Sequence, residues 1–242
     1  EICACLVGSE MCIRDRFVNP MQFGVGEDLE SYPRDMERDS ALCENAGAAL
    51  IFHPQPEEMY HKDFSSFVDM NTLTKGLCGK TRPIHFRGVC TVVSKLFNIV
   101  QPDKAYFGQK DAQQLAVIRH MVSDLNFGIE IVGCPIVREA DGLAKSSRNT
   151  YLNEQERKAA VVLNQSLQAA QDLYENGERS AAVLSAAIRE KLAAEPLAKP
   201  DYVEIVDWNT LEPVETIQDS VLMAIAVSVS YTHLRAHETC AD

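Results

Sequence analysis

Residues 85–134 decide the fold, and they read HFRGVCTVVSKLFNIVQPDKAYFGQKDAQQLAVIRHMVSDLNFGIEIVGC. Over residues 85–101 the apolar side chains recur at helical spacing, and Pro102 ends that pattern. The elements predicted after it are a strand over 104–107, an amphipathic helix over 111–126 and a strand over 129–134. Strands joined by helices of this length favour a parallel sheet with crossover helices, so the stretch predicts an α/β fold.

The flanking sequence extends this pattern in both directions. Before it, the end of a strand runs into a loop at 17–20, a helix is predicted over 34–45, and a short buried strand over 49–52. After it, Asn153 and Glu156 have the spacing of a helix capping box. The elements predicted there are helices over 154–176 and 180–194 and strands over 202–206 and 221–227. A small α+β second domain therefore begins near residue 150.

The two ends of the chain look foreign to this pattern. Residues 1–16 and 228–242 fit no element pattern, and both resemble translated sequencing-adapter read-through. We interpret both segments as artefacts and leave them out of the prediction of the fold.

Composition excludes several classes of function. A net charge of −12 argues against a broad nucleic-acid footprint. The sequence contains no run of 18 apolar residues, so it predicts no membrane span. The cysteines suggest no disulfide framework, which favours a reduced cytoplasmic setting. The terminal Cys and His residues do not have the spacing of a standard zinc finger, so no metal site is predicted from Cys3, Cys5, Cys12, His233, His237 and Cys240.

Three polar clusters are candidates for binding small molecules. Gly108–Asp111 follows a strand and opens a helix, a position where backbone N–H groups and Lys110 suit a phosphate. Residues 145–148 hold two hydroxyls between two cations, which are donors for a polyphosphate. Gln22 and Gln114 are amides that suit a hydroxy acid. Taken singly, each cluster is better explained as a solvated loop or surface residue than as a binding site.

Five stretches of sequence, taken together, are more specific than any one cluster. They are residues 17–23, 32–34, 85–98, 102–114 and 141–149. In this order they resemble the pantothenate synthetase (pantoate–β-alanine ligase) family, and the resemblance covers about residues 17–227. It implies a Rossmann-like nucleotidylyltransferase fold. It also implies ligation of pantoate and β-alanine with ATP and Mg²⁺ through a pantoyl-adenylate, releasing AMP and pyrophosphate, usually in a homodimer.

The resemblance also implies roles for individual residues. Gln22 and Gln114 would bind the substrates pantoate and β-alanine, chiefly pantoate, and Lys110 and Arg148 would support catalysis. The ATP-binding residues it implies are Gly108, Gln109, Lys110, Asp111, Val137, Lys145, Ser146, Ser147 and Arg148. Tyr32 would lie near the phosphates. From their positions in the sequence alone, His85 at the start of the 85–101 helix either faces the site or does not, and Asp111 beside Lys110 would orient Lys110 or meet magnesium.

One family feature does not occur in the sequence. None of the six histidines lies in a His-x-Gly-His motif. In the family this motif precedes the loop that residues 17–23 resemble. We therefore expect an N- and C-terminally truncated fragment that lacks the first parallel strand, is cut near Val227 and is inactive. The expected organisation is a partial Rossmann-like ATP- and pantoate-binding domain over 17–149 and the C-terminal domain over 150–227.

The sequence is also compatible with two alternatives. One is another enzyme of the nucleotidylyltransferase superfamily, which the long glutamine-bearing motifs disfavour. The other is a non-catalytic nucleotide-binding fragment, which the missing histidine motif favours. Release of pyrophosphate that depends on pantoate would distinguish the ligase from both.

Overall fold

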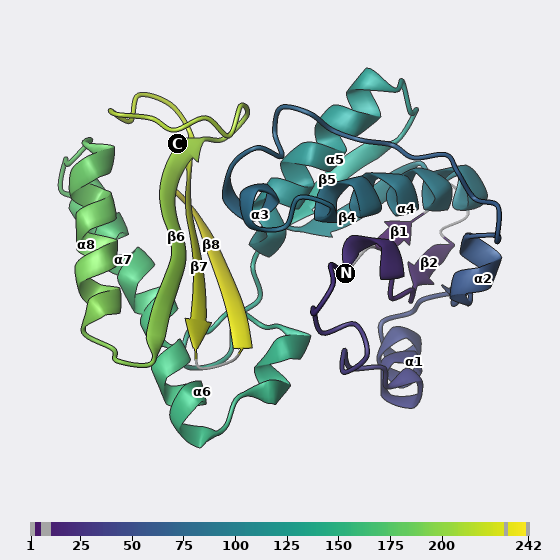
Figure 1. Ribbon diagram of the computed structural model, residues 1–242, viewed down its shortest axis with the longest axis horizontal. Helices are drawn as coiled ribbons and strands as arrows, with labels where there is room; N and C mark the ends of the chain where they lie inside the picture. The colour runs from purple at the N-terminus through teal and green to yellow at the C-terminus, as the bar shows by residue number, and fades with distance from the viewer. Residues whose placement is uncertain (1–2, 6–10, 230–231, 241–242) are drawn as a thin grey trace. The chain divides into compact units, whose positions relative to one another are not determined.

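The computed structural model describes residues 3–5, 11–229 and 232–240 and divides the chain into two compact units (Figure 1). The first unit holds the described residues up to Lys75 together with Gly79–Cys134. The second unit holds Gly76–Cys78 and the chain from Pro135 onward. It thus begins before the predicted boundary at residue 150, because Leu143 belongs to the hydrophobic core of the second unit.

The sheet of the first unit has five strands in the order β3-β2-β1-β4-β5. Their bounds are β1 (Cys3–Cys5), β2 (Cys12–Asp15), β3 (Leu50–Phe52), β4 (Lys104–Gly108) and β5 (Glu130–Cys134). β2 is parallel to β3 and β4 is parallel to β5, as the α/β prediction requires. The central strand β1 is antiparallel to both of its neighbours.

This sheet corrects the prediction that residues 1–16 form no element. The expected lack of the family's first parallel strand is not contradicted, because the central strand β1 runs antiparallel to both of its neighbours. Cys3–Cys5 and Cys12–Asp15 are both strands, and they fill the space between β3 and β4. Pairing uses main-chain groups that would otherwise be left as open sheet edges, so it does not require an alternating side-chain pattern. Within β2 only Ile13 is buried, which is why no strand pattern is visible there in the sequence.

The helices of the first unit follow the predicted pattern. They include α1 (Met36–Asn45), α2 (Pro56–Met59), α4 (His85–Val100) and α5 (Ala112–Asp124), and α3 (Leu77–Thr81) is divided between the two units. α4 buries the face that the periodicity marked out, and its Phe97 ring meets Phe107 of β4 at 6.5 Å between centroids. The helix ends where Gln101 adopts a left-handed conformation before Pro102.

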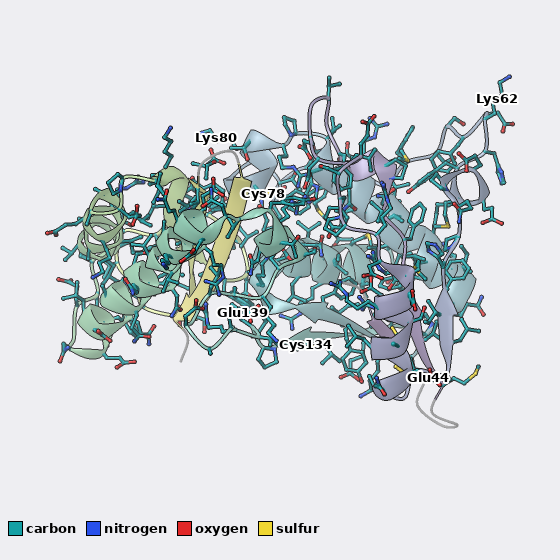
Figure 2. All side chains as sticks on the ribbon, turned by 90° about the horizontal axis from the view of Figure 1, so that it is seen from below. Glu44, Lys62, Cys78, Lys80, Cys134 and Glu139 are labelled. Atoms are coloured by element: carbon teal, nitrogen blue, oxygen red, sulfur yellow. The ribbon has the colours of Figure 1, made fainter. Side chains whose placement is uncertain are left out.

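Helix α1 and strand β3 of the first unit are both exposed to solvent. α1 has no buried residue, and Glu44 projects from it (Figure 2). The strand predicted at 49–52 is present as β3, but the prediction that it is buried is wrong. Leu50 is 46% exposed because β3 lies at the edge of the sheet.

The second unit is an antiparallel three-stranded sheet with helices packed on it (Figure 1). Its strands are β6 (Ala198–Asp207), β7 (Val221–Val229) and β8 (Thr232–Cys240), and its helices are α6 (Glu154–Ala160), α7 (Val162–Glu175) and α8 (Ala181–Ala193). Leu163, Leu184 and Ile188 from the helices share one core with Ile225 of β7. The predicted capping box is confirmed, with Asn153 Oδ1 accepting from the Glu156 N–H at 3.0 Å.

The C-terminal end of this sheet corrects a second prediction. β7 continues past Val227 to Val229, and β8 pairs along its whole length from Val229↔Thr232 to Val221↔Cys240. β7 is therefore a middle strand, whose main-chain groups need a partner on each side. The predicted absence of elements over 228–242 is therefore wrong for this chain.

Candidate functional site

A cavity of about 120 Å³ in the first unit contains both predicted substrate-binding amides, Gln22 and Gln114. It opens beside the end of β2, where ligands bind in open α/β sheets. Asn19 and Tyr32 also line it, and α4 supplies an apolar wall made of Val89, Val92, Val93 and Leu96. A small cavity with one apolar wall and two amides suits a compact hydroxy acid.

The loop that carries Gln22 is built by local hydrogen bonds. Asn19 caps the short 3₁₀ helix η1 (Pro20–Gln22), and its Oδ1 accepts from the Met21 N–H at 3.3 Å. The same Oδ1 accepts from the Tyr60 hydroxyl at 2.7 Å. Asn19 itself is only 2% exposed. The loop that carries Gln22 is therefore held in place by a buried, hydrogen-bonded side chain.

Two cationic or imidazole groups hold the main chain of Gln22. Arg82 Nη2 donates to its carbonyl oxygen at 3.1 Å, and His85 Nδ1 donates to the same oxygen at 3.0 Å. His85 therefore contacts the loop, but it does not line the cavity. Its Nδ1 carries the proton, because a carbonyl oxygen can only accept.

Arg82 is fixed in turn by a carboxylate. Its Nε donates to Glu27 Oε1 at 2.7 Å, and its Nη2 pairs with Glu27 Oε2. Burial works to raise the pKa of Glu27, but the hydrogen bond and charge of Arg82 outweigh it and hold that pKa below its usual range. No motif in the sequence pointed to Arg82, Glu27 or Tyr60.

Asp15 places an acid in the same cavity. Its Oδ1 is buried without a hydrogen-bond partner in the described structure. Burial raises the pKa of Asp15 to about 6, against the opposing charges of Arg14 and Arg16. Arg16 is already paired with Asp39 at 2.6 Å. Sequence reasoning missed Asp15 because it assigned residues 1–16 no structure.

The second predicted cluster lies where β4 runs into α5. Gly108 is exposed and precedes the 3₁₀ helix η2 (Gln109–Asp111), and α5 starts directly after it. Lys110 Nζ lies 3.5 Å from Asp111 Oδ1. The start of α5 exposes main-chain N–H groups and the positive end of the helix dipole next to a lysine, an arrangement that suits a phosphate.

The third predicted cluster belongs to the second unit. The main-chain N–H of Lys145 donates to Val137 O at 2.8 Å, which brings these two segments side by side. Ser146 caps the 3₁₀ helix η3 (Ser147–Tyr151) by accepting from the Arg148 N–H at 3.3 Å. Lys145 is exposed, and Val137 is 64% exposed. The cluster is thus a hydrogen-bonded, partly exposed loop that carries cations and hydroxyls.

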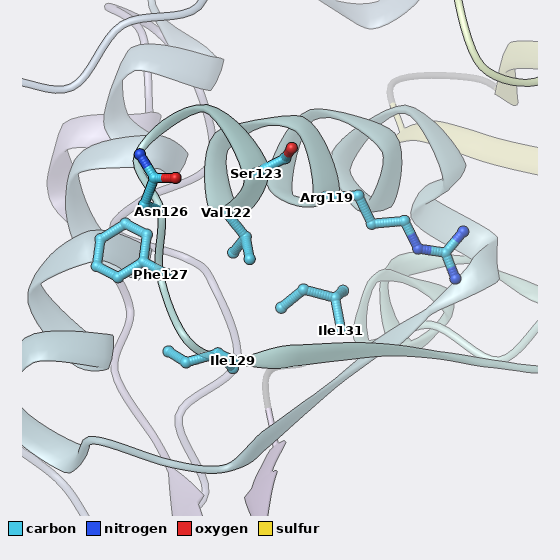
Figure 3. Close-up of a pocket in the computed structure, with 7 residues that line it drawn as sticks. All are labelled: Arg119, Val122, Ser123, Asn126, Phe127, Ile129 and Ile131. Atoms are coloured by element: carbon cyan, nitrogen blue, oxygen red, sulfur yellow. The ribbon is translucent and has the colours of Figure 1, made fainter.

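A larger hollow of about 520 Å³ lies beside α5 and β5 (Figure 3). Val122 of α5 and Ile131 of β5 face each other across it, and Arg119 supplies its cation. None of the residues predicted to bind a substrate lines it. We assign it no ligand.

Within residues 3–5, 11–229 and 232–240, no helix is both long and apolar enough to cross a membrane. Those residues also hold no group of three or more His, Cys, Asp or Glu side chains placed to bind a metal ion. The side chains of Cys3, Cys5, His233, His237 and Cys240 lie outside what the structure describes.

Fold and site together define a class of protein. The protein is Rossmann-like and of the nucleotidylyltransferase type. Its sheet contains parallel strand pairs, and an amide-lined cavity and a helix that starts with glycine and lysine lie beyond the strand ends.

Comparison with known proteins gives the family. A family model described as pantoate-beta-alanine ligase matches residues 4–235. The chain is 56% identical to the pantothenate synthetase of Clostridium botulinum (strain Loch Maree) over 218 residues, which are 90% of this chain and 78% of the relative. It is 59% identical to that of Heliobacterium modesticaldum over the same shares. The chain belongs to the pantoate–β-alanine ligase family.

Solved structures give the same result. Pantothenate synthetase from Thermus thermophilus is similar with a TM-score of 0.91 and 46% identity, covering 93% of this chain and 82% of that one. The pantoate-beta-alanine ligase of Francisella tularensis, solved with beta-gamma ATP and beta-alanine, has a TM-score of 0.74 and 25% identity. It covers 93% of this chain and 78% of that one.

Proposed function

We propose that this protein joins pantoate to β-alanine with ATP as the co-substrate. The observation that carries the proposal is the pairing of Gln22 and Gln114 in one cavity of about 120 Å³ with an apolar wall. Pantoate is a small dimethyl hydroxy acid, so it needs both an apolar contact and oriented polar groups. The Francisella relative, solved with an ATP compound and β-alanine, supports the other two substrates.

The reaction would proceed in two balanced steps. First, a carboxylate oxygen of pantoate attacks the α-phosphorus of ATP, and the bond to pyrophosphate breaks. Then the neutral amine of β-alanine attacks the acyl carbon of pantoyl-adenylate, the bond to AMP breaks, and the amine loses a proton. Gln22 and Gln114 orient pantoate for the first attack, which contributes through positioning.

The first step brings an anionic carboxylate toward an anionic phosphate, so cations must offset the repulsion. We assign Lys110 and Arg148 to this task, with Gly108, Gln109 and Asp111 lining the ATP site. Val137 contacts the nucleotide, and Lys145, Ser146 and Ser147 add donors for the phosphates. The support for these roles is the glycine–lysine start of α5 and the ordered cationic loop at 145–148.

Magnesium is part of this proposal. Mg²⁺ is usually bound by one or two carboxylates together with substrate phosphates. Asp111 is a partly exposed carboxylate beside Lys110 at the start of α5, so the residues present fit such an ion. When bound, Mg²⁺ would neutralise phosphate charge.

Three further expectations complete the proposal. The family resemblance supports a homodimer, which light scattering on the purified protein would test. Cys43, Cys90 and Cys134 are free thiols, which supports a cytoplasmic setting. The expectation that this chain is inactive rests on the absence of a His-x-Gly-His motif from its 242 residues.

The decisive experiment measures pyrophosphate release with ATP, Mg²⁺, pantoate and β-alanine. It compares this chain with a chimera that carries the histidine-motif segment of the Clostridium botulinum relative. Pantoate-dependent release by the chimera alone would support both the ligase and the inactivity of the chain. ATP binding without any response to pantoate would instead indicate a nucleotide-binding protein and refute the substrate assignment.

A further inference from the structure

A chain of hydrogen bonds runs from Tyr60 through Asn19 to the side chain of Gln22. The Tyr60 hydroxyl donates to Asn19 Oδ1 at 2.7 Å. Asn19 Nδ2 then donates to the Gly88 carbonyl oxygen at 3.0 Å and to Gln22 Oε1 at 3.3 Å. Three side chains and one main-chain carbonyl are thus connected in a defined donor-to-acceptor order.

The orientation of the Asn19 amide in this chain is fixed by main-chain groups. The Gly88 carbonyl can only accept, so it faces Nδ2. The Met21 N–H can only donate, so it faces Oδ1. Rotating the Asn19 amide by half a turn would break both contacts at once. Its two ends are therefore not interchangeable.

This orientation determines which end of Gln22 is available to a ligand. Asn19 Nδ2 donates to Gln22 Oε1, so the oxygen end of that amide is occupied. Within the part of the chain that the structure describes, Gln22 Nε2 donates to no protein group, and Gln22 lines the cavity. The amide presents N–H groups rather than an oxygen to whatever binds there.

We infer that Tyr60 and Asn19 are positioning residues that fix Gln22 as a hydrogen-bond donor, so the ligand atom opposite Gln22 is an acceptor oxygen of a carboxylate or hydroxyl. The inference rests on the proposed function, in which that ligand is pantoate. It extends the proposed function by assigning a role to Tyr60 and a polarity to Gln22.

The surroundings of Tyr60 suit this role. Its ring packs against Phe17 and Phe64, with centroids 6.3 and 5.1 Å away. Lys95 Nζ lies 5.8 Å from the ring centroid, in the range of a cation–π contact. Burial raises the pKa of Tyr60, so its hydroxyl keeps its proton and remains a donor at neutral pH.

The first test is ligand binding by Tyr60→Phe, which keeps the ring contacts and removes only the hydroxyl. Titration calorimetry on the full chain should show pantoate affinity about fivefold weaker and ATP affinity unchanged, as expected for one lost hydrogen bond that orients an amide. Tyr174→Phe is the matched control in the second unit and should alter neither affinity. Equal pantoate affinity in Tyr60→Phe and the parent chain would overturn the inference.

The second test reads the hydrogen bonds directly and does not depend on catalysis. In ¹⁵N-edited NMR spectra of the free chain, the side-chain amide resonances of Asn19 and Gln22 should move in Tyr60→Phe and stay in place in Tyr174→Phe. Adding pantoate should shift the Gln22 amide protons downfield, as for a donor. If the parent chain binds no pantoate, the proposed function is wrong, and the free-chain spectra still decide whether Tyr60 orients Gln22. Unmoved Asn19 and Gln22 resonances would refute the inference.

Discussion

Gly88 of α4 lies so close to the loop before it that a Cβ atom at this position would stand 2.4 Å from the main-chain oxygen of Met21. It would also stand 2.6 Å from the Gln22 nitrogen. Real Cβ contacts to main-chain atoms are not this short, so the helix and the loop can meet only through a glycine. The position of Gln22 over the cavity therefore depends on a missing side chain 66 residues later in sequence.

Replacing Gly88 with alanine should separate the loop from α4. We expect Gly88→Ala to lower the free energy of unfolding by about 1–3 kcal/mol, as overpacking usually does. Pantoate affinity should fall as well, because Gln22 moves. Gly128→Ala is the control, since a Cβ there meets nothing within 4 Å. Denaturant unfolding and titration calorimetry of the two variants check both effects, and unchanged binding in Gly88→Ala would contradict the geometry.

Sequence reasoning succeeded where a local pattern carries the information. The spacing of apolar residues predicted α4, and Asn153 with Glu156 predicted the start of α6. The structure places Gln22 and Gln114 in one cavity, and their binding of one ligand stays a prediction.

Sequence reasoning failed where contacts depend on the path of the chain. Tyr60 reaches Asn19 across 41 residues, and Arg82 reaches Gln22 across 60. No local periodicity encodes either contact. β1 and β8 are held by main-chain pairing, which leaves little trace in side-chain pattern. For this reason the ends of the chain were the least predictable part of the fold.

The Glu27–Arg82 pair should make stability depend on acid pH. The pKa of Glu27 is lowered on folding, so its contribution is complete above the ordinary value of 4.5 and is lost as the pH falls through the lower folded value. Glu27→Gln should lose about 1–3 kcal/mol of unfolding free energy at pH 7, because Arg82 keeps its charge without a carboxylate.

Unfolding measured from pH 7 to pH 3 checks this expectation. The difference between Glu27→Gln and the parent chain should shrink below pH 4.5. Glu44→Gln, at an exposed position on α1, should match the parent chain throughout (Figure 2). A difference that stayed constant across the range would show that the charge of Glu27 is not what stabilises Arg82.

Asp15 should change the pH dependence of stability in the direction opposite to that of Glu27. Folding raises its pKa from 3.8 to about 6, so the folded state binds the proton more tightly and stability falls as the pH rises between those values. At pH 7 the deficit amounts to at most about 3 kcal/mol. Asp15→Asn removes the buried charge and should be more stable than the parent chain at pH 7 but equal to it once the pH lies well below the unfolded pKa of 3.8. Equal stability at pH 7 would mean that the Asp15 carboxylate gains compensation from solvent or from Arg14.

Lys110 should matter for ATP and not for pantoate. A lysine at a helix start next to a phosphate makes a charge-assisted hydrogen bond, whose loss costs about 1.5–3 kcal/mol. Lys110→Ala should therefore weaken ATP binding by about tenfold or more. Pantoate affinity should be retained, because Lys110 does not line the cavity that holds Gln22 and Gln114.

Calorimetric titration with ATP and Mg²⁺ at low and high salt checks this prediction. Lys62→Ala removes the same charge at an exposed position far out on the surface, which separates a local contact from a change in net charge (Figure 2). Both variants should lose the long-range attraction that salt screens, but Lys110→Ala alone should keep a deficit at high salt. If both variants lost the same ATP affinity at low salt and both regained it at high salt, Lys110 would act only through long-range electrostatic attraction. The phosphates of ATP would then have to bind somewhere other than the start of α5.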